Sequence, residues 1–363
     1  MEIEQLYYQT PGHALAASIV LSVLDIAAVA ARLYTRQKQK QKIKADDWLM
    51  LPALLFTVGI GVTLIYGVAV ESFGVPTKIP EDFSGDPREI LALASPQLKT
   101  MNTLQWTFAA VIPLAIGCTK ASFVCFYLRI FSVNKRSCTH YLLVGMLVFV
   151  IIWTLAFFFS ELFQCGLNFW AVNSSVLDLA TQCPHTQILD IAVCSSDVAA
   201  DLVIFAIPIP LVWRLNLSTP KKLAVCAVFL LGGVTIIASL LRLFMMVRLY
   251  SIGFDANEDG VLVTTGYLYW GMVECGIAVI AACLPSLQFM TRTWSWKAFT
   301  SSFRSLWSAR SYDSIDASKR NPTKDSSGSE KKDSVPDEFE MSHVKGHEIS
   351  ATSKRTTSEE SLV

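Results

Sequence analysis

Six ionisable side chains well inside stretches of the sequence that are otherwise apolar are the candidates for a functional site, and their chemistry is the first clue to function. They are Asp25, Lys120, Asp197, Asp201, Arg242 and Glu274. A charged group inside a bilayer is costly, so it is expected to face other helices and to pair with an opposite charge. Such residues can hold helices together through ion pairs, or they can line a polar cavity for a ligand or a transported solute. The residues alone leave both interpretations open.

The depth of each charge in its apolar stretch predicts its partner. Measured from the basic, cytosolic end at about 1.5 Å per residue, Lys120 lies about 14 Å deep. Asp25 lies at about the same depth, and Asp201 lies about 4 Å further in. We therefore expect an inner layer of charge in which Lys120 pairs with Asp25 or with Asp201.

A second layer of charge is expected nearer the outer surface. Asp197, Glu274 and Arg242 lie about 24–29 Å from the cytosolic ends of their stretches. Arg242 is therefore expected to pair with Glu274 or with Asp197. Asp197 and Asp201 are four residues apart, which places both carboxylates on one face of the same helix.

Seven apolar stretches must position these charges. Each can cross about 30 Å of hydrocarbon, which takes roughly 20 helical residues. Backbone polar groups find no water in lipid, so a spanning segment is a helix or part of a closed barrel, and runs without strict alternation exclude the barrel. The fold class is therefore all-α, a polytopic bundle of seven transmembrane helices. The expected spans are His13–Tyr34, Trp48–Val70, Leu104–Ile130, Tyr141–Leu162, Ile188–Trp213, Leu223–Val247 and Gly266–Met290.

Lysine and arginine concentrate in the connections on one side of the predicted bundle. The first, third and fifth connections contain twelve of them, whereas the N-terminus and the other connections contain three. Basic loops are retained in the cytosol. The N-terminus is therefore predicted outside and the C-terminus in the cytosol, in a multi-pass protein that we assign to the plasma membrane.

The chain divides into four parts. Residues 1–12 are a short extracellular N-terminus, and residues 13–290 are the seven-helix domain. Large apolar residues recur at helical spacing within residues 291–309, which predicts an amphipathic helix on the inner leaflet, the alternative being a frayed segment. Residues 310–363 are rich in serine and charge and almost without large apolar residues, so we expect a disordered cytosolic tail.

Two cysteines and one asparagine stand out in the fourth connection, which is predicted to lie outside. Of the nine cysteines, only Cys165 and Cys183 fall in an outer loop, where a disulfide persists. We predict that they pair, the alternative being two free thiols. Asn173 begins an Asn-Ser-Ser sequon between them and is the predicted N-glycosylation site.

No constellation typical of an enzyme or of a metal site occurs in the spans. The five histidines lie at helix ends, in loops or in the tail, and no histidine clusters with a carboxylate inside a span. No glycine-rich phosphate loop precedes a helix. We expect no enzymatic activity, no metal and no nucleic-acid partner. The lipid bilayer is the expected environment.

Several short strings occur in order along the predicted spans. They are Arg32–Arg36, Asp46–Trp48, Lys120–Phe131, Phe163–Cys165, Asp201–Leu215, Ser239–Arg242, Trp270–Glu274 and Ala282–Pro285. Together they resemble the fungal seven-helix rhodopsin-domain family, which includes integral membrane proteins of the satratoxin-cluster type and fungal receptor-like proteins. The resemblance covers residues 12–290.

The resemblance implies that some relatives act like G-protein-coupled receptors and that others are encoded in secondary-metabolite gene clusters. Retinal in a rhodopsin attaches to a lysine of the seventh helix, and Gly266–Met290 contains no lysine. We therefore expect no retinal and no other cofactor.

Two functions remain from the sequence. The first is a receptor-like protein that senses an unknown small-molecule ligand and engages a cytosolic effector such as a G protein. The alternative is a carrier or accessory membrane protein for a small metabolite, with the charged layers as a polar path and a link to secondary metabolism.

Overall fold

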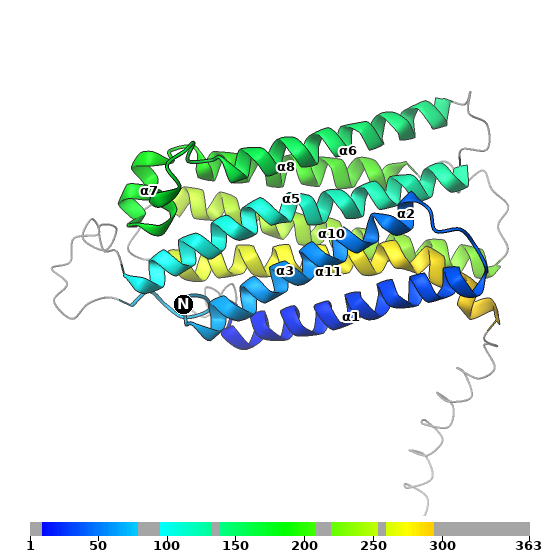
Figure 1. The fold of residues 1–363 in the computed structure, drawn as a ribbon, viewed down its shortest axis with the longest axis horizontal. Helices are drawn as coiled ribbons and strands as arrows, with labels where there is room; N and C mark the ends of the chain where they lie inside the picture. Colours follow the sequence, from blue (N-terminus) through cyan, green and yellow to red (C-terminus); the bar gives the residue numbers. More distant parts are fainter. Residues whose placement is uncertain are drawn as a thin grey trace, which may run out of the picture. The chain divides into compact units, whose positions relative to one another are not determined.

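The structure, a computed structural model, describes residues 9–78, 95–131, 138–207, 209, 219–252 and 259–293. Long helices follow one another along the chain and lie side by side (Figure 1). The long helices are α1 (Pro11–Lys38), α3 (Met50–Ala69), α5 (Pro96–Phe131), α6 (Cys138–Leu162), α8 (Thr186–Ala206), α10 (Thr219–Ile252) and α11 (Gly260–Thr293). Three short elements are α2 (Ala45–Trp48), the 3-10 helix η1 (Phe169–Asn173) and α7 (Val176–Gln182). The predicted all-α, polytopic membrane fold is confirmed.

Six segments of the described chain are long and apolar enough to cross a membrane. They are α1, α2 continued by α3, α5, α6, and parts of α10 and α11. The remaining long helix, α8, is not among these segments, and it carries three acids, Asp190, Asp197 and Asp201, within its 21 residues. It nevertheless packs against α5, α6 and α10 as part of the bundle. A helix with three acids therefore belongs to the same bundle as the six apolar segments.

The central helices are α5 and α11. In α5, 72% of the most apolar stretch is buried, and in α11 61%, against 22% in α1 and 17% in α6. The outer helices instead expose large apolar side chains, such as Val23, Leu55 and Ile152. An apolar surface of this extent suits contact with lipid, because a soluble protein exposes only limited apolar patches. The helices that carry Lys120 and Glu274 are therefore the two that the other helices enclose most.

Local sequence explains how the helices begin and how closely they pack. The Thr10 side chain accepts a hydrogen bond from the backbone N–H of His13, and Pro11 occupies the first turn of α1. Gly117 of α5 faces Thr154 of α6 so closely that a Cβ atom at this position would overlap the threonine side chain. Glycine there allows the two helices to approach each other.

The connection between α6 and α8 is folded and covalently closed. Cys165 and Cys183 form a disulfide, as predicted. The two half-cystines pack with Ala171 and Val172 of η1, and Trp106 of α5 lies against this cluster. The connection, with η1 and α7, is therefore fastened to one end of α5.

Several observed helices extend beyond the predicted spans. The third span was expected to begin at Leu104, but α5 begins at Pro96, and α11 runs on to Thr293. Residues of the fifth predicted span beyond Ile207, apart from position 209, lie outside the described residues, as do residues 294–309 of the predicted amphipathic helix. The predicted tail, 310–363, and residues 1–8 also lie outside them.

Candidate functional site

Asp197 of α8 lies at the centre of a buried ion-pair network. Its Oδ1 accepts a hydrogen bond from Lys120 Nζ of α5 at 2.6 Å, and its Oδ2 accepts one from Arg242 Nη2 of α10 at 2.7 Å. Lys120 Nζ also donates to the Asp197 backbone carbonyl at 3.0 Å. One carboxylate is therefore shared by two cations from two other helices.

Two more carboxylates complete the network at its ends. Asp201 Oδ1 lies 2.8 Å from Lys120 Nζ, and the hydroxyl of Ser239 donates to Asp201 Oδ2 at 2.9 Å. Glu274 Oε2 of α11 lies 3.1 Å from Arg242 Nε. The network thus links α5, α8, α10 and α11, and three carboxylates face two cations.

The network is almost entirely withdrawn from solvent. The side chains of Asp197 and Arg242 are 0% exposed, whereas that of Asp201 is 14% exposed. The Lys120 ammonium also lies 5.8 Å from the centre of the Trp153 ring. A charge buried this deeply is stabilised only by its ion pairs and hydrogen bonds. Removing one partner therefore leaves a buried charge uncompensated.

The pairs predicted within the two layers of charge are present, but the layers are not separate. Pairs of Lys120 with Asp201, and of Arg242 with Glu274 and Asp197, are all present. Asp197, however, contacts both cations and joins the layers into one network. Helix depth is a single coordinate, and it does not reveal that Lys120 extends toward the level of Asp197.

Asp25 does not belong to this network: of the two partners predicted for Lys120, Asp201 pairs with it and Asp25 does not. The residue is 0% exposed, and neither carboxylate oxygen has a hydrogen-bond partner in the described part of the chain. It lies on α1 against α11, where a Cβ on Gly276 would come within 3.4 Å of Asp25 Oδ2. Lys120 points instead from α5 toward α8.

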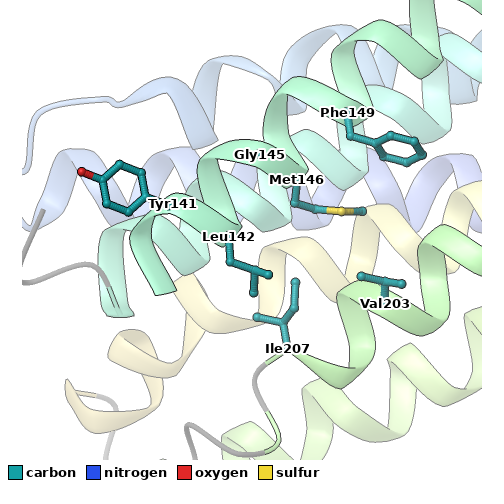
Figure 2. A pocket seen from close by; sticks show the side chains of 7 residues that line it. All are labelled: Tyr141, Leu142, Gly145, Met146, Phe149, Val203 and Ile207. Atoms are coloured by element: carbon teal, nitrogen blue, oxygen red, sulfur yellow. The ribbon is translucent and has the colours of Figure 1, made fainter. Parts of the chain in front are cut away.

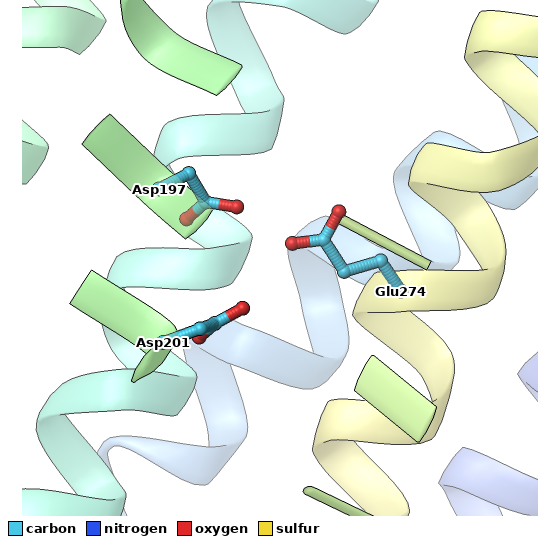
Figure 3. A group of neighbouring side chains, drawn as sticks. All are labelled: Asp197, Asp201 and Glu274. Atoms are coloured by element: carbon cyan, nitrogen blue, oxygen red, sulfur yellow. The ribbon is translucent and has the colours of Figure 1, made fainter. Parts of the chain in front are cut away.

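Asp197, Asp201 and Glu274 converge from two helices (Figure 3). One oxygen of each lies within 4.8 Å of the others, a spacing compatible with a metal ion. Lys120 and Arg242 already hold oxygens of all three carboxylates. The two cations supply the positive charge that a metal would bring, so we assign these residues to ion pairs.

A second cluster of charge was missed by the sequence analysis. Arg32 donates from Nε to Asp47 Oδ1 at 2.8 Å and from Nη2 to Asp46 Oδ2 at 2.9 Å. Arg36 approaches the same two oxygens at 3.2 Å each. Arg32 Nη1 also donates to the Ala282 backbone carbonyl of α11 at 2.6 Å. The arginines counted as loop charges are thus buried and paired.

The cluster extends to the end of α5. Gln41 Oε1 accepts hydrogen bonds from Arg36 Nη1 at 2.7 Å and from Arg129 Nη2 at 2.9 Å. The hydroxyl of Ser122 donates to the Asp46 backbone carbonyl at 2.7 Å. The four-residue spacing of Arg32 and Arg36, just before two adjacent aspartates, is the sequence signal that predicts such a cluster.

An apolar groove lies between α6 and α8 (Figure 2). Its volume is about 360 Å³, and it is lined by Tyr141, Leu142, Gly145, Met146, Phe149, Val203 and Ile207. Several of these side chains, including Tyr141 and Phe149, are among the exposed apolar residues of the bundle. The groove therefore suits an acyl chain better than a polar ligand.

Comparison with known proteins assigns the chain to a family. A model of the fungal rhodopsin domain matches residues 31–293. A SAT4 family membrane protein of Emericella nidulans is 32% identical over 57% of this chain and 49% of its own length, so the match spans about half of that relative. No solved structure matches.

Two further relatives align over more of the chain. Receptor GIN3 of Arthrobotrys oligospora is 25% identical over 85% of this chain and 70% of its own length. A phomoidride biosynthesis cluster protein H of a fungal species is 26% identical over 77% of this chain and 89% of its own length. The family model covers both charged clusters from Arg32 to Glu274. The chain therefore belongs to the fungal rhodopsin domain family of membrane proteins.

Proposed function

We propose that this protein is a receptor-like membrane protein of the plasma membrane that senses a small-molecule ligand without retinal. A ligand bound from outside changes the arrangement of the helices, and the cytosolic side then engages an effector such as a G protein. A relative of the same family is named as a receptor and aligns over most of this chain. That relationship supports the class of function.

The sharing of Asp197 by Lys120 and Arg242 is the observation that carries the proposal. Within the described residues, Arg242 Nη1 and both oxygens of Glu274 have no hydrogen-bond partner. Glu274 Oε2 has its ion pair with Arg242 Nε, whereas Arg242 Nη1 and Glu274 Oε1 are left without a hydrogen bond in the described part of the chain. We infer that these atoms allow the four helices to pair their charges in a second way. A receptor requires such an element with two arrangements, whose balance a ligand can shift.

The arginine–aspartate cluster offers a route to the cytosolic side. It lies where α1, α2, α5 and α11 meet, at the end of the bundle predicted to face the cytosol. Arg129 joins it through Gln41 and keeps a quarter-exposed side chain. A movement of α5 at Lys120 would therefore displace Arg129, which lies two and a half turns further along the same helix.

A carrier of a small metabolite is the alternative function. One relative is named after a biosynthesis gene cluster. Asp201 is also the most exposed carboxylate of the network, so a transported solute that enters the network would contact Asp201 first. A carrier predicts that Asp201→Asn abolishes flux while effector recruitment is absent.

Two measurements separate these functions. The first is proximity labelling of G-protein α subunits in fungal cells that express the wild type, Asp197→Asn or the loop control Asp178→Asn. Loss of the shared carboxylate should release the helices and change basal labelling about threefold or more, whereas the control should match the wild type. A threefold change corresponds to about 0.7 kcal/mol in the balance of states.

The second measurement is flux through vesicles that contain only this protein. Vesicles are loaded with a mixture of small organic acids and amines, and their release is followed by mass spectrometry. The receptor proposal expects no release above protein-free vesicles. Release of a solute that Asp201→Asn abolishes, together with unchanged labelling in Asp197→Asn, would replace the receptor by the carrier.

A further inference from the structure

The connection between α1 and α2 contains four exposed lysines and no acid. Residues 37–45 are Gln-Lys-Gln-Lys-Gln-Lys-Ile-Lys-Ala. The arginines just before it behave differently, because Arg32 and Arg36 are buried and paired with Asp46 and Asp47. The lysines are therefore a separate group of charges at the protein surface. We call this group the lysine patch, and its members are Lys38, Lys40, Lys42 and Lys44.

The protein does not neutralise the charge of the lysine patch. The next acids along the chain, Asp46 and Asp47, form ion pairs with arginines. Among the described residues, the lysines that form ion pairs are Lys78 and Lys120. Four like charges within seven residues repel one another and attract a surface of opposite charge. The lysine patch therefore suits an anionic partner.

Exposed aromatic side chains indicate where the lysine patch lies relative to the membrane. Tyr34 of α1 is 53% exposed, and Trp48, the last residue of α2, is 62% exposed. Tyrosine and tryptophan are enriched where a span meets the lipid headgroups. Lys38 Nζ lies 5.7 Å from the centre of the Tyr34 ring. We therefore expect the ammonium groups of the lysine patch at the level of the headgroup phosphates.

Hydrogen bonds fix the connection that carries the lysine patch. The backbone N–H of Gln39 donates to the Thr35 carbonyl, and that of Gln41 donates to the Arg36 carbonyl, each at 3.1 Å. The Gln41 side chain accepts hydrogen bonds from Arg36 and Arg129, so the connection is attached to the end of α5 (Figure 1). Lysines on a fixed backbone lose less conformational entropy on binding than lysines on a flexible one.

We propose that the lysine patch binds the multiply charged phosphate headgroup of an anionic phospholipid, such as a phosphoinositide, in the inner leaflet. Clusters of four or more basic residues directly beside a span attract such lipids. A lipid fits better than an acidic protein, because Tyr34 and Trp48 beside the patch expose apolar rings that suit contact with the membrane. The proposal uses the predicted orientation, and it holds whether the protein is a receptor or a carrier.

Binding of a fluorescent short-chain phosphatidylinositol bisphosphate tests the lysine patch. The purified full-length protein is kept in an uncharged detergent, and fluorescence anisotropy gives Kd. Each lysine near an anionic lipid changes affinity by about fivefold, so Lys40→Gln with Lys42→Gln should bind about 25-fold more weakly than the wild type. Binding by the wild type should also weaken as salt is raised, because the charges are exposed to the solvent.

Two control variants separate the lysine patch from net charge and from folding. Lys78→Gln with Lys99→Gln removes two lysines between α3 and the first turn of α5, at the other end of the bundle, and should bind as the wild type does. Lys40→Arg with Lys42→Arg keeps the charge and should keep the binding. All three variants should melt within about 2 °C of the wild type, because the changes are at the surface.

Three results would overturn the proposal. The first is equal binding by the wild type and by Lys40→Gln with Lys42→Gln. The second is equal affinity for phosphatidylcholine, which has no net charge. The third is equal affinity for the soluble inositol phosphate headgroup, which would identify a free phosphate compound as the ligand. Weak binding of every lipid, together with G-protein labelling that the double glutamine variant loses, would assign the lysine patch to a protein and would also overturn the proposal.

Discussion

The two charged clusters of this protein use similar residues in opposite ways. In the arginine–aspartate cluster, Arg32 and Arg36 each contact both Asp46 and Asp47, so each of these four side chains has two ionic partners. In the Asp197 network, three carboxylates face two cations, and several polar atoms among the described residues lack hydrogen bonds. We expect a cluster in which every charge has two partners to resist rearrangement more than a network with unsatisfied polar atoms.

Their positions in the sequence differ in the same way. The two arginines and two aspartates at the centre of the arginine–aspartate cluster lie within 16 residues of one another, so bringing these four together costs little chain entropy. The Asp197 network joins residues from Lys120 to Glu274 and forms only when four helices have packed. We infer that the arginine–aspartate cluster stabilises the bundle, whereas the pairing of charges in the Asp197 network depends on how its four helices are arranged. Three experiments within the two clusters, and one at Asp25 outside both, test this difference.

The largest effect is expected from Asp47→Asn. The variant leaves Arg32 and Arg36 with one carboxylate between them and weakens the acceptor that meets the backbone N–H of Lys44. A buried ion pair that loses one partner costs about 3–5 kcal/mol. Unfolding in detergent with increasing denaturant measures the loss. A cost below about 1 kcal/mol would show that the cluster does not fasten the bundle.

A double substitution in the Asp197 network is expected to cost less than one of its single substitutions. Arg242→Met leaves Glu274 and one oxygen of Asp197 without a cation, at about 3–5 kcal/mol. Adding Glu274→Met removes one of these charges and should recover about 1–3 kcal/mol, measured as the coupling energy of a double-mutant cycle. Additive costs would mean that Arg242 and Glu274 do not interact.

Glu274→Gln alone should be milder than Asp47→Asn. It leaves two carboxylates and two cations in the network, so the charges become balanced. We expect a loss of about 1–2 kcal/mol at most, together with a change in basal effector labelling. The same loss of stability as in Asp47→Asn, without a change in labelling, would remove the distinction between the two clusters.

Asp25→Asn should have the smallest effect. Neither oxygen of Asp25 has a hydrogen-bond partner in the described residues, so the variant breaks no pair and removes a buried acid. We expect a change within about 1 kcal/mol, in the direction of higher stability. A loss of about 3 kcal/mol or more, comparable to that of a broken ion pair, would reveal a partner that the described residues do not include.

Much of the fold can be predicted from particular features of the sequence. Long apolar runs predicted helical spans, because lipid leaves the backbone no other way to form hydrogen bonds. Cys165 and Cys183 were predicted to pair because they were the two cysteines assigned to an outer loop. The predicted glycosylation of Asn173 and the predicted orientation stay predictions. A wild type that carries a glycan lost in Asn173→Gln would support both.

The candidate site was predictable only in part. The residues of the Asp197 network were found because charge is rare in apolar runs, whereas Asp25 was found by the same signal and lies elsewhere. Arg32 and Arg36 were assigned to a basic loop, because nothing in the sequence shows that α1 continues to Lys38.

The sequence by itself determined that the bundle lies in a lipid bilayer, the class of fold and the family of this protein. Hydropathy and ordered motifs are local properties that depend only on the order of residues along the chain. Only the tertiary structure decided which charges meet, because pairing depends on how each helix is rotated and which helices are its neighbours. Asp25 and Asp197 show the difference: both are buried acids in spans, yet Asp197 faces Lys120 and Arg242, and Asp25 faces Gly276.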